Sequence, residues 1–176
     1  MHYRRTRVKG ASYFFTVNLA DRDGTTFVDF IDHLQEAFRQ VKERHPFENN
    51  GIVILPEHIH TIWTMPLDDC NYSMRWRLIK SAFSRSLPKT ERISQSRKSK
   101  AERGVWQRRF WEHKIRNEID YARHIDYMYF NPVRHGYVER VQDWPHSSFH
   151  RDVRNKVYPI DWGGGVDITI NAGERN

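Results

Sequence analysis

The chain has 176 residues, with 29 Lys or Arg against 22 Asp or Glu, a formal net charge of +7. This length suits a single domain with its own core, and the positive charge favours a polyanionic partner such as nucleic acid. The lone cysteine, Cys70, excludes an internal disulfide framework and a cysteine-rich zinc site, and no apolar run suggests a signal or membrane segment, so we expect a cytoplasmic protein.

The first 65 residues predict a strand, a helix and a pair of strands. Residues 12–20 (S-Y-F-F-T-V-N-L-A) are β-branched and aromatic, as is typical of a strand, and the turn sequence D-R-D-G follows them. Between 27 and 41 the apolar residues recur at spacings of three and four, which indicates one face of a helix. Two further strands, 51–55 and 58–65, are separated by a Pro-Glu dipeptide, which favours an antiparallel hairpin.

The rest of the chain predicts two more helices and a fourth strand. Apolar spacing indicates a helix over 74–83, and the polar, basic stretch from about 88 to 104 predicts a mobile loop. Aromatic residues favour a strand within 105–115. Asn117 can cap the next helix, and we expect Pro132 to end it because the residue before a proline resists helical angles.

This order of elements predicts an α+β fold, in which helices are packed on one face of an antiparallel sheet. We expect one domain over residues 1–150, followed by a C-terminal extension over 151–176 that holds a few aromatic residues.

The stretch L-P-E-H-I-H-T-I-W-T-M-P, residues 55–66, places two histidines on one face of a predicted strand. Successive side chains of a strand alternate, so His58 and His60 project together and could hold a metal ion. With 10 histidines in the chain, however, roughly 0.6 such pairs arise by chance, so two ordinary hydrogen-bonded imidazoles remain an alternative.

A second group of candidate residues lies on the helix that Asn117 begins. Tyr127 and Asn131 are four residues apart and share a helical face, where they can present a phenolic oxygen and an amide oxygen to one point. His124, three residues before Tyr127, is an additional candidate contact. Two imidazoles and an amide would leave open positions on a metal for substrate oxygens.

Several motifs together resemble a known family. The H-I-H after L-P-E, the Y-x-x-x-N followed by P-V-R-H-G, and the later D-W-P-x-S-S-F are similar to the REP-associated tyrosine transposases. These are single-tyrosine members of the HUH endonucleases, related to the IS200/IS605 insertion-sequence transposases. The resemblance runs from Y-F-F-T-V-N-L near the start to Y-P-I-D-W-G near the end of the chain.

The resemblance implies a ferredoxin-like or RRM-like sheet and assigns roles to four residues. His58 and His60 become metal ligands, Tyr127 the nucleophile and Asn131 the third ligand, where the insertion-sequence relatives commonly have glutamine. The implied metal is Mg²⁺ or Mn²⁺, and the implied substrate is single-stranded DNA with a REP-type hairpin. The implied reaction is cleavage and rejoining through a 5′-phosphotyrosine intermediate.

Two groups of basic residues could contact the phosphates of such DNA. One precedes the first strand and the other follows the polar face of the 74–83 helix. The candidates are Arg4, Arg5, Arg7 and Lys9, and Arg75, Arg77, Lys80 and Arg85. A solvated helix surface is the ordinary alternative for such a charged face.

Two other functions are compatible with the same fold. An RRM-like nucleic-acid-binding module without chemistry would carry the R/K-G-F/Y-G/A-F-V-x-F/Y signature, which this sequence lacks. A zinc-dependent hydrolase would need a further ligand and a general base such as Glu57, which an extended strand would direct away from His58. Protein partners are not predicted.

Overall fold

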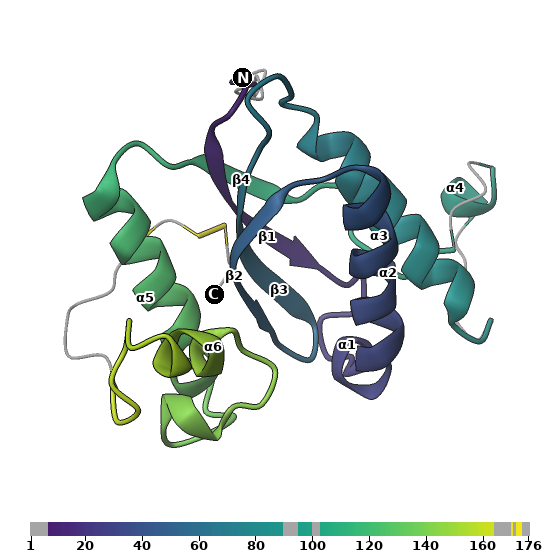
Figure 1. Cartoon of the computed structure of the whole chain (residues 1–176). Coiled ribbons are helices and arrows are strands. Elements are labelled where there is room, and N and C mark those ends of the chain that lie inside the picture. Colours follow the sequence, from purple (N-terminus) through teal and green to yellow (C-terminus); the bar gives the residue numbers. More distant parts are fainter. Residues whose placement is uncertain (1–6, 90–94, 100–102, 164–169, 171, 174–176) are drawn as a thin grey trace.

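The computed structural model describes residues 7–89, 95–99, 103–163, 170, 172 and 173. Its elements, in chain order, are β1 (Ser12–Asn18), α1 (Thr26–Asp29), α2 (Ile31–Arg44), β2 (Glu48–Ile54), β3 (His58–Thr64), α3 (Tyr72–Ser86), α4 (Gln95–Lys98), β4 (Trp111–Lys114), α5 (Glu118–Arg134), η1 (Val141–Asp143) and α6 (Phe149–Arg154). The strands form one antiparallel sheet in the order β2-β3-β1-β4 (Figure 1). This is the ferredoxin-like arrangement, so the predicted α+β class is confirmed.

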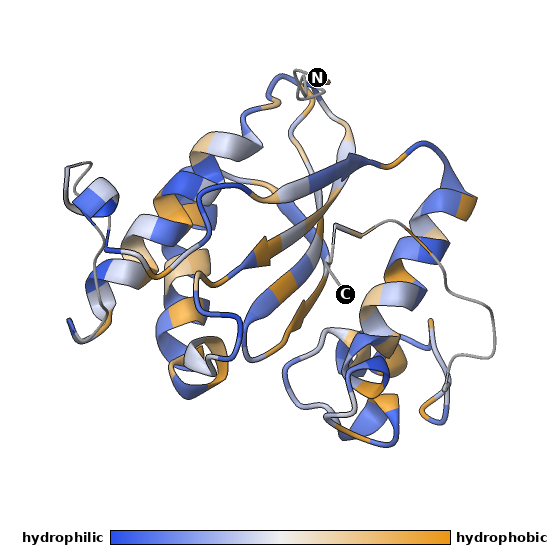
Figure 2. Cartoon of the chain, turned by 180° about the vertical axis from the view of Figure 1, so that it is seen from behind, coloured by the Kyte–Doolittle hydropathy of each residue, from blue (hydrophilic) through white to orange (hydrophobic). Residues whose placement is uncertain are grey.

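Helices cover both faces of this sheet, which corrects the expectation that they pack on one face (Figure 1). Helices α2 and α3 pack on the face that carries Phe15 and Trp63, and α5 with α6 packs on the face that carries Phe14 and Ile62. Phe14 and Phe15 are neighbours that point to opposite faces, and both are fully buried. Hydrophobic residues, coloured orange, occur among hydrophilic ones along the strands of the sheet (Figure 2). A strand that is apolar on both faces needs a layer of cover on each.

Most predicted elements are present, with three local differences. The 51–65 hairpin forms as β2 and β3. The 27–41 helix is interrupted at Phe30, which leaves the short α1 before α2. The 105–115 strand is reduced to β4, preceded by an isolated bridge from Trp106 to Leu19. Helix α4 lies within the 88–104 stretch predicted as a mobile loop, of which 90–94 and 100–102 lie outside the described residues.

Helix α5 begins as predicted and ends later than predicted. The Asn117 side chain caps it by accepting a hydrogen bond from the backbone N–H of Asp120. Pro132 lies inside the last turn and does not end the helix. The helix ends at Arg134, and two residues later Gly136 has a φ of +73°, which lets the backbone N–H of Tyr137 donate to the Pro132 carbonyl at 2.9 Å. This glycine-dependent cap satisfies the last carbonyls of the helix.

A close approach between α5 and β2 fixes where the helix sits. A Cβ atom added at Gly51 would lie 2.7 Å from Met128 Cε and 2.9 Å from Ile125 Cδ1, both on α5. Glycine therefore lets the helix settle on the edge strand, beside a register shift in β2. Among the residues that the structure describes, no helix is both long and apolar enough to cross a bilayer.

Candidate active site

The two histidines of β3 face each other on the sheet face that α5 covers. His58 and His60 are 1% and 0% exposed, and their Nε2 atoms are 3.1 Å apart. His60 is paired with Thr16 across the β1–β3 ladder, so the surrounding backbone is held by the centre of the sheet. The direction that strand alternation predicted for both side chains is confirmed.

Helix α5 brings a third donor atom to the histidine pair. Asn131 Oδ1 lies 3.2 Å from His58 Nε2, and the Asn131 side chain is fully buried. Two imidazole nitrogens and one amide oxygen thus converge, although they come from segments 73 residues apart. A divalent cation accepts donors of these types, so this group fits the metal that the sequence predicts.

The Nδ1 atoms of His58 and His60 are both held by hydrogen bonds. His58 Nδ1 lies 2.6 Å from Glu57 Oε1, to which it donates. Thr16 donates its hydroxyl proton to the Ala172 carbonyl at 2.6 Å, so its oxygen accepts from His60 Nδ1 at 3.0 Å. With a proton on each Nδ1, both Nε2 atoms present lone pairs to the site, which is the usual arrangement of metal-ligating histidines.

Glu57 points toward His58. An extended strand at residue 57 would direct its side chain away, but β3 begins only at His58, and Glu57 Oε1 accepts a hydrogen bond from His58 Nδ1. Burial raises the pKa of Glu57, and the hydrogen bond from His58 outweighs it, so the net pKa lies below its ordinary value. Tyr137 donates to the other Glu57 oxygen at 3.1 Å. Its own pKa is raised to about 12 by burial and by the Glu57 charge.

Tyr127 lies on the same face of α5 and is 3% exposed. Its ring is 5.5 Å from the His60 ring, in an edge-on arrangement. The Arg134 guanidinium carbon lies 5.3 Å from the centre of the Tyr127 ring, an arrangement that we did not predict from the sequence. A guanidinium within about 6 Å of the centre of an aromatic ring makes a cation–π contact. The i, i+7 spacing of the two residues on one helix is the signal that could have revealed it.

His124 does not join the histidine pair of β3. It belongs to a second group, in which His113, Asp120 and His124 each place one ligand atom within 4.8 Å of the others. These three residues form a group that could hold a metal ion. The Phe14 ring stands between the two groups, 5.3 Å from the His60 ring and 4.9 Å from the His124 ring.

The predicted DNA-binding residues separate into different environments. Arg4 and Arg5 lie outside the described residues, whereas Arg7 and Lys9 are exposed before β1. On α3, Arg77 and Arg85 are exposed and Lys80 is half-buried, with its Nζ 2.9 Å from the Gln107 carbonyl. Because α3 packs on the other face of the sheet, these side chains are not brought together with His58 and His60.

Arg75 has a structural environment, so we leave it out of the DNA-binding surface. It is 2% exposed and donates to the carbonyls of His45 and Pro46 at 3.0 and 2.7 Å. It also pairs with Asp69 at 2.6 Å. The helical period placed Arg75 beside the polar face of α3, but a long side chain can turn inward where backbone carbonyls offer partners.

Replacing Arg75 by alanine is expected to lower the free energy of unfolding by about 2 kcal/mol, because the partly buried His45 and Pro46 carbonyls and the Asp69 carboxylate lose their donor. Replacing Arg77, which is exposed on the same helix, is expected to change it by less than about 0.5 kcal/mol. Urea denaturation of both variants measures the difference. Equal stabilities would show that Arg75 does not hold the 45–46 turn.

Comparisons with known proteins agree with one another. No family model matches the chain. A protein of Haemophilus influenzae assigned to the REP-associated tyrosine transposases is 50% identical over 172 residues, 97% of this chain and 98% of the relative. The REP-associated tyrosine transposase of Escherichia coli K12 is 47% identical over 173 residues, 98% of this chain and 96% of the relative.

A solved structure matches the fold as well as the sequence. It is a REP-associated tyrosine transposase bound to a REP hairpin, with a TM-score of 0.85 and 46% identity, covering 100% of this chain and 98% of that one. Relatives this similar over nearly their full length share the fold and the family. The chain therefore belongs to the REP-associated tyrosine transposases, a family of enzymes.

Proposed function

We propose that this chain cleaves and rejoins hairpin-bearing single-stranded DNA, with a divalent metal and with Tyr127 as the nucleophile. The observation that carries the proposal is the convergence of His58 Nε2, His60 Nε2 and Asn131 Oδ1 on the face of α5 that also holds Tyr127. The solved relative is bound to a REP hairpin, which supports the same class of DNA as the substrate here.

In the proposed reaction the Tyr127 oxygen attacks the phosphorus of the scissile phosphodiester. The Tyr127 hydroxyl loses its proton as a phosphorus–oxygen bond to its oxygen forms and the bond to the 3′ oxygen breaks. The 3′ oxygen takes up one proton in exchange and leaves as a 3′ hydroxyl. The 5′ phosphate remains joined to the tyrosine. A second 3′ hydroxyl can reverse the step and reseal the strand, and no nucleotide cofactor is needed because the number of phosphoester bonds is conserved. Arg134 stabilises the phenolate that attacks.

The residues proposed to hold the metal are His58, His60 and Asn131. Mg²⁺ or Mn²⁺ held there supplies positive charge that polarises the scissile phosphate. Two imidazole nitrogens and one oxygen suit Mn²⁺ better than Mg²⁺, which prefers oxygen donors. The Nδ1 hydrogen bonds to Glu57 and Thr16 keep both Nε2 lone pairs directed at the same point.

The proposal is tested by covalent-adduct formation on single-stranded oligonucleotides that carry hairpins from the flanking genome. A protein–DNA adduct that survives denaturing electrophoresis is expected with Mg²⁺ or Mn²⁺, and EDTA is expected to abolish it because the phosphate then loses its charge partner. Adding back either metal should restore it. An adduct that forms equally well in EDTA would contradict a metal role for His58 and His60.

The same assay separates the proposal from a purely binding module. An RRM-like protein would retain the hairpin in a native gel and never form the adduct. The fold also argues against such a module, because RRM domains stack bases on an exposed sheet face. Here Phe14 and Phe15, which point to opposite faces, are both buried beneath helices.

We further propose that the exposed basic side chains of α3 contact DNA phosphates. They line one side of a cavity of about 600 Å³ whose other wall includes Arg97, Arg103 and Arg108. Among the described residues that line this cavity there is no carboxylate. Such a surface attracts phosphates through charge alone, so its contribution should depend on salt.

Replacing Arg77 or Arg85 by alanine is expected to weaken hairpin binding. Each variant should also reduce the slope of log affinity against log salt by about 1 for every phosphate that the protein no longer neutralises. Fluorescence anisotropy across a salt series measures both effects. Arg39→Ala is the matched control, because Arg39 is an exposed helix residue already paired with Glu36 and Glu43. Unchanged slopes for both α3 variants would place the DNA elsewhere.

A further inference from the structure

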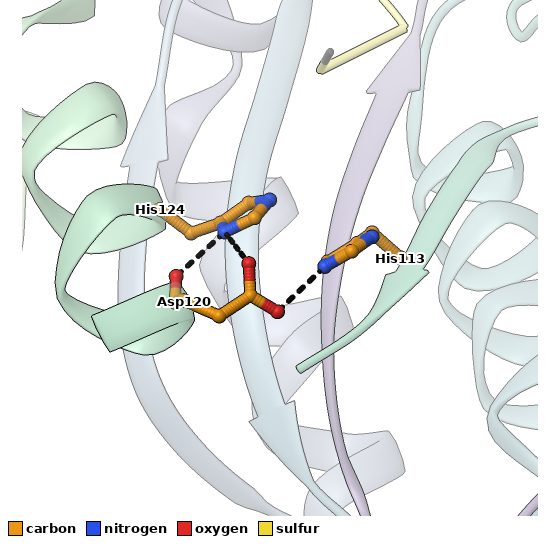
Figure 3. A group of neighbouring side chains, drawn as sticks. All are labelled: His113, Asp120 and His124. Carbon is orange, nitrogen blue, oxygen red and sulfur yellow. Dashed lines mark hydrogen bonds and ion pairs between the residues drawn. The ribbon is translucent and has the colours of Figure 1, made fainter. Parts of the chain in front are cut away.

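The second group of potential ligands, here called the His113 cluster, consists of His113, Asp120 and His124. His113 lies on β4, and Asp120 and His124 lie one turn apart at the start of α5 (Figure 3). His113 Nε2 is 2.8 Å from Asp120 Oδ2, and His124 Nδ1 is 3.3 Å from Asp120 Oδ1. The side chains are 20%, 19% and 5% exposed, so the cluster is sheltered while an edge of it can still be reached from solvent.

The cluster is separate from the proposed active site, although it lies on the same side of the sheet. The Phe14 ring lies between His60 and His124 and contacts both rings. The two groups share no ligand residue, and α5 carries members of both. Asp120 and His124 belong to its first turns, and Tyr127 and Asn131 follow at spacings of three and four along the same face.

We infer that the His113 cluster binds a transition-metal ion of the Zn²⁺ type, in addition to the metal proposed for the active site. Two imidazoles and one carboxylate are a donor set typical of zinc, with a fourth position for water, whereas Mg²⁺ prefers oxygen ligands. Bonds of about 2.0–2.2 Å in a tetrahedral site place the ligand atoms about 3.4 Å apart. The cluster atoms lie within 4.8 Å of one another, but the His113 and His124 rings are stacked, with centroids 4.5 Å apart and planes at 12°. Both rings must therefore rotate to direct a nitrogen at one ion.

Hydrogen bonds within the cluster indicate which atoms can bind. His124 Nδ1 donates to the Asp120 backbone carbonyl at 2.7 Å, so its lone pair is on Nε2. An imidazole that donates its other N–H to a backbone carbonyl is a usual metal ligand. His113 Nε2 lies within hydrogen-bond distance of Asp120 Oδ2, and an ion bound to both atoms would replace this hydrogen bond.

An ion in this position would join β4 to the first turns of α5 and so restrain the helix that carries Tyr127. Zinc binding should therefore raise the unfolding temperature, because a ligand that binds only the folded state stabilises it. Neither the rise in unfolding temperature nor the affinity of the His113 cluster for Zn²⁺ depends on DNA or on the cleavage reaction. The inference can thus fail while the proposed function stands, and the reverse also holds.

The experiment is a Zn²⁺ titration of metal-free full-length protein against a chromophoric chelator, without DNA. The wild type is expected to take up two equivalents, and the His58→Ala/His60→Ala double variant one. In that double variant, adding His113→Ala or Asp120→Asn should remove the remaining equivalent, and adding His33→Ala, an exposed histidine on α2, should leave it. Circular dichroism confirms that each variant is folded.

Cobalt substitution provides a second readout. Co²⁺ added to the His58→Ala/His60→Ala variant should give visible absorption bands of a four-coordinate site, and these should be lost with His113→Ala. Zinc uptake that persists after both His113→Ala and Asp120→Asn would overturn the inference. The complete loss of uptake in the His58→Ala/His60→Ala variant alone would also overturn it.

Discussion

Replacing Tyr127 by phenylalanine is expected to reduce the covalent protein–DNA adduct by on the order of 10⁴-fold or more, the scale seen when a catalytic nucleophile is removed. The change deletes one oxygen and keeps the ring that packs against His60 and Arg134. Hairpin binding should therefore stay within about twofold of the wild type, a difference below about 0.5 kcal/mol. Denaturing electrophoresis measures the adduct, and anisotropy measures binding.

Tyr129→Phe is the matched control on the same helix. Tyr129 lies on the side of α5 where its hydroxyl donates to Asp152 at 2.5 Å, and burial followed by that hydrogen bond raises its pKa far above the ordinary value. Losing this bond should cost about 1–2 kcal/mol of stability and leave the adduct in place. An adduct that persists in Tyr127→Phe, or that disappears only in Tyr129→Phe, would show that the nucleophile is misassigned.

The strands, and the residues that share one face of each strand, could be predicted because the two-residue period of a strand can be recognised in the sequence alone. The alternation in β3 put His58 and His60 on one side, and the structure agrees. The side of the sheet taken by α5 was missed. The signal for it was present in β1, where Phe14 and Phe15 are adjacent large apolar residues, since a strand covered on one side only would alternate.

The end of α5 illustrates two local rules that compete. The rule for residues before proline predicted a stop at Pro132, and the glycine cap at Gly136 is what the chain uses. Pro132 has no N–H, so the helix lacks the one hydrogen bond that this residue would otherwise donate to the Met128 carbonyl. The buried Pro132 ring also packs with the α5 layer. Tertiary packing therefore decides between the two rules.

The candidate site was predictable where its residues lie on regular elements and not where they lie on connections. Spacing on β3 and α5 identified His58, His60, Tyr127 and Asn131, which the structure brings together, and their catalytic roles remain proposals. Glu57 lies in the connection before β3, so neither the strand period nor the helix period predicts the direction of its side chain. The His113 cluster requires β4 to pair beside β1, which only the sheet order reveals.

Loss of either histidine of the β3 pair is also expected to reduce DNA cleavage strongly. Replacing His60 by alanine is expected to reduce cleavage by more than about 10³-fold, because a metal at a phosphate contributes several kcal/mol to transition-state stabilisation and each 1.36 kcal/mol is a factor of ten. His58→Ala should have a similar effect. Rates of adduct formation at saturating Mn²⁺ measure this, and DNA affinity should be retained.

Glu57 and Tyr137 do not touch the proposed metal but hold its ligand His58. Replacing either should slow adduct formation less than replacing His58 or His60, and a higher Mn²⁺ concentration should restore the rate. Glu57→Gln still accepts from His58 Nδ1 but removes the negative charge that makes the ring a better donor, so metal affinity should fall by about 10–100-fold. Tyr137→Phe removes only the hydroxyl that donates to Glu57, and the loss should be smaller again. The apparent Mn²⁺ requirement of each variant is the measurement.

The order of these effects distinguishes a metal site from a pair of packed imidazoles. If His58 and His60 only filled space beneath α5, Glu57→Gln would change stability and leave the Mn²⁺ dependence of the wild type unchanged. If they hold the metal, Glu57→Gln should reach nearly the wild-type rate at high Mn²⁺, whereas His60→Ala should not, because a weakened ligand can be saturated and a missing one cannot. A rescue of His60→Ala by Mn²⁺ would therefore contradict the assignment of that residue as a ligand.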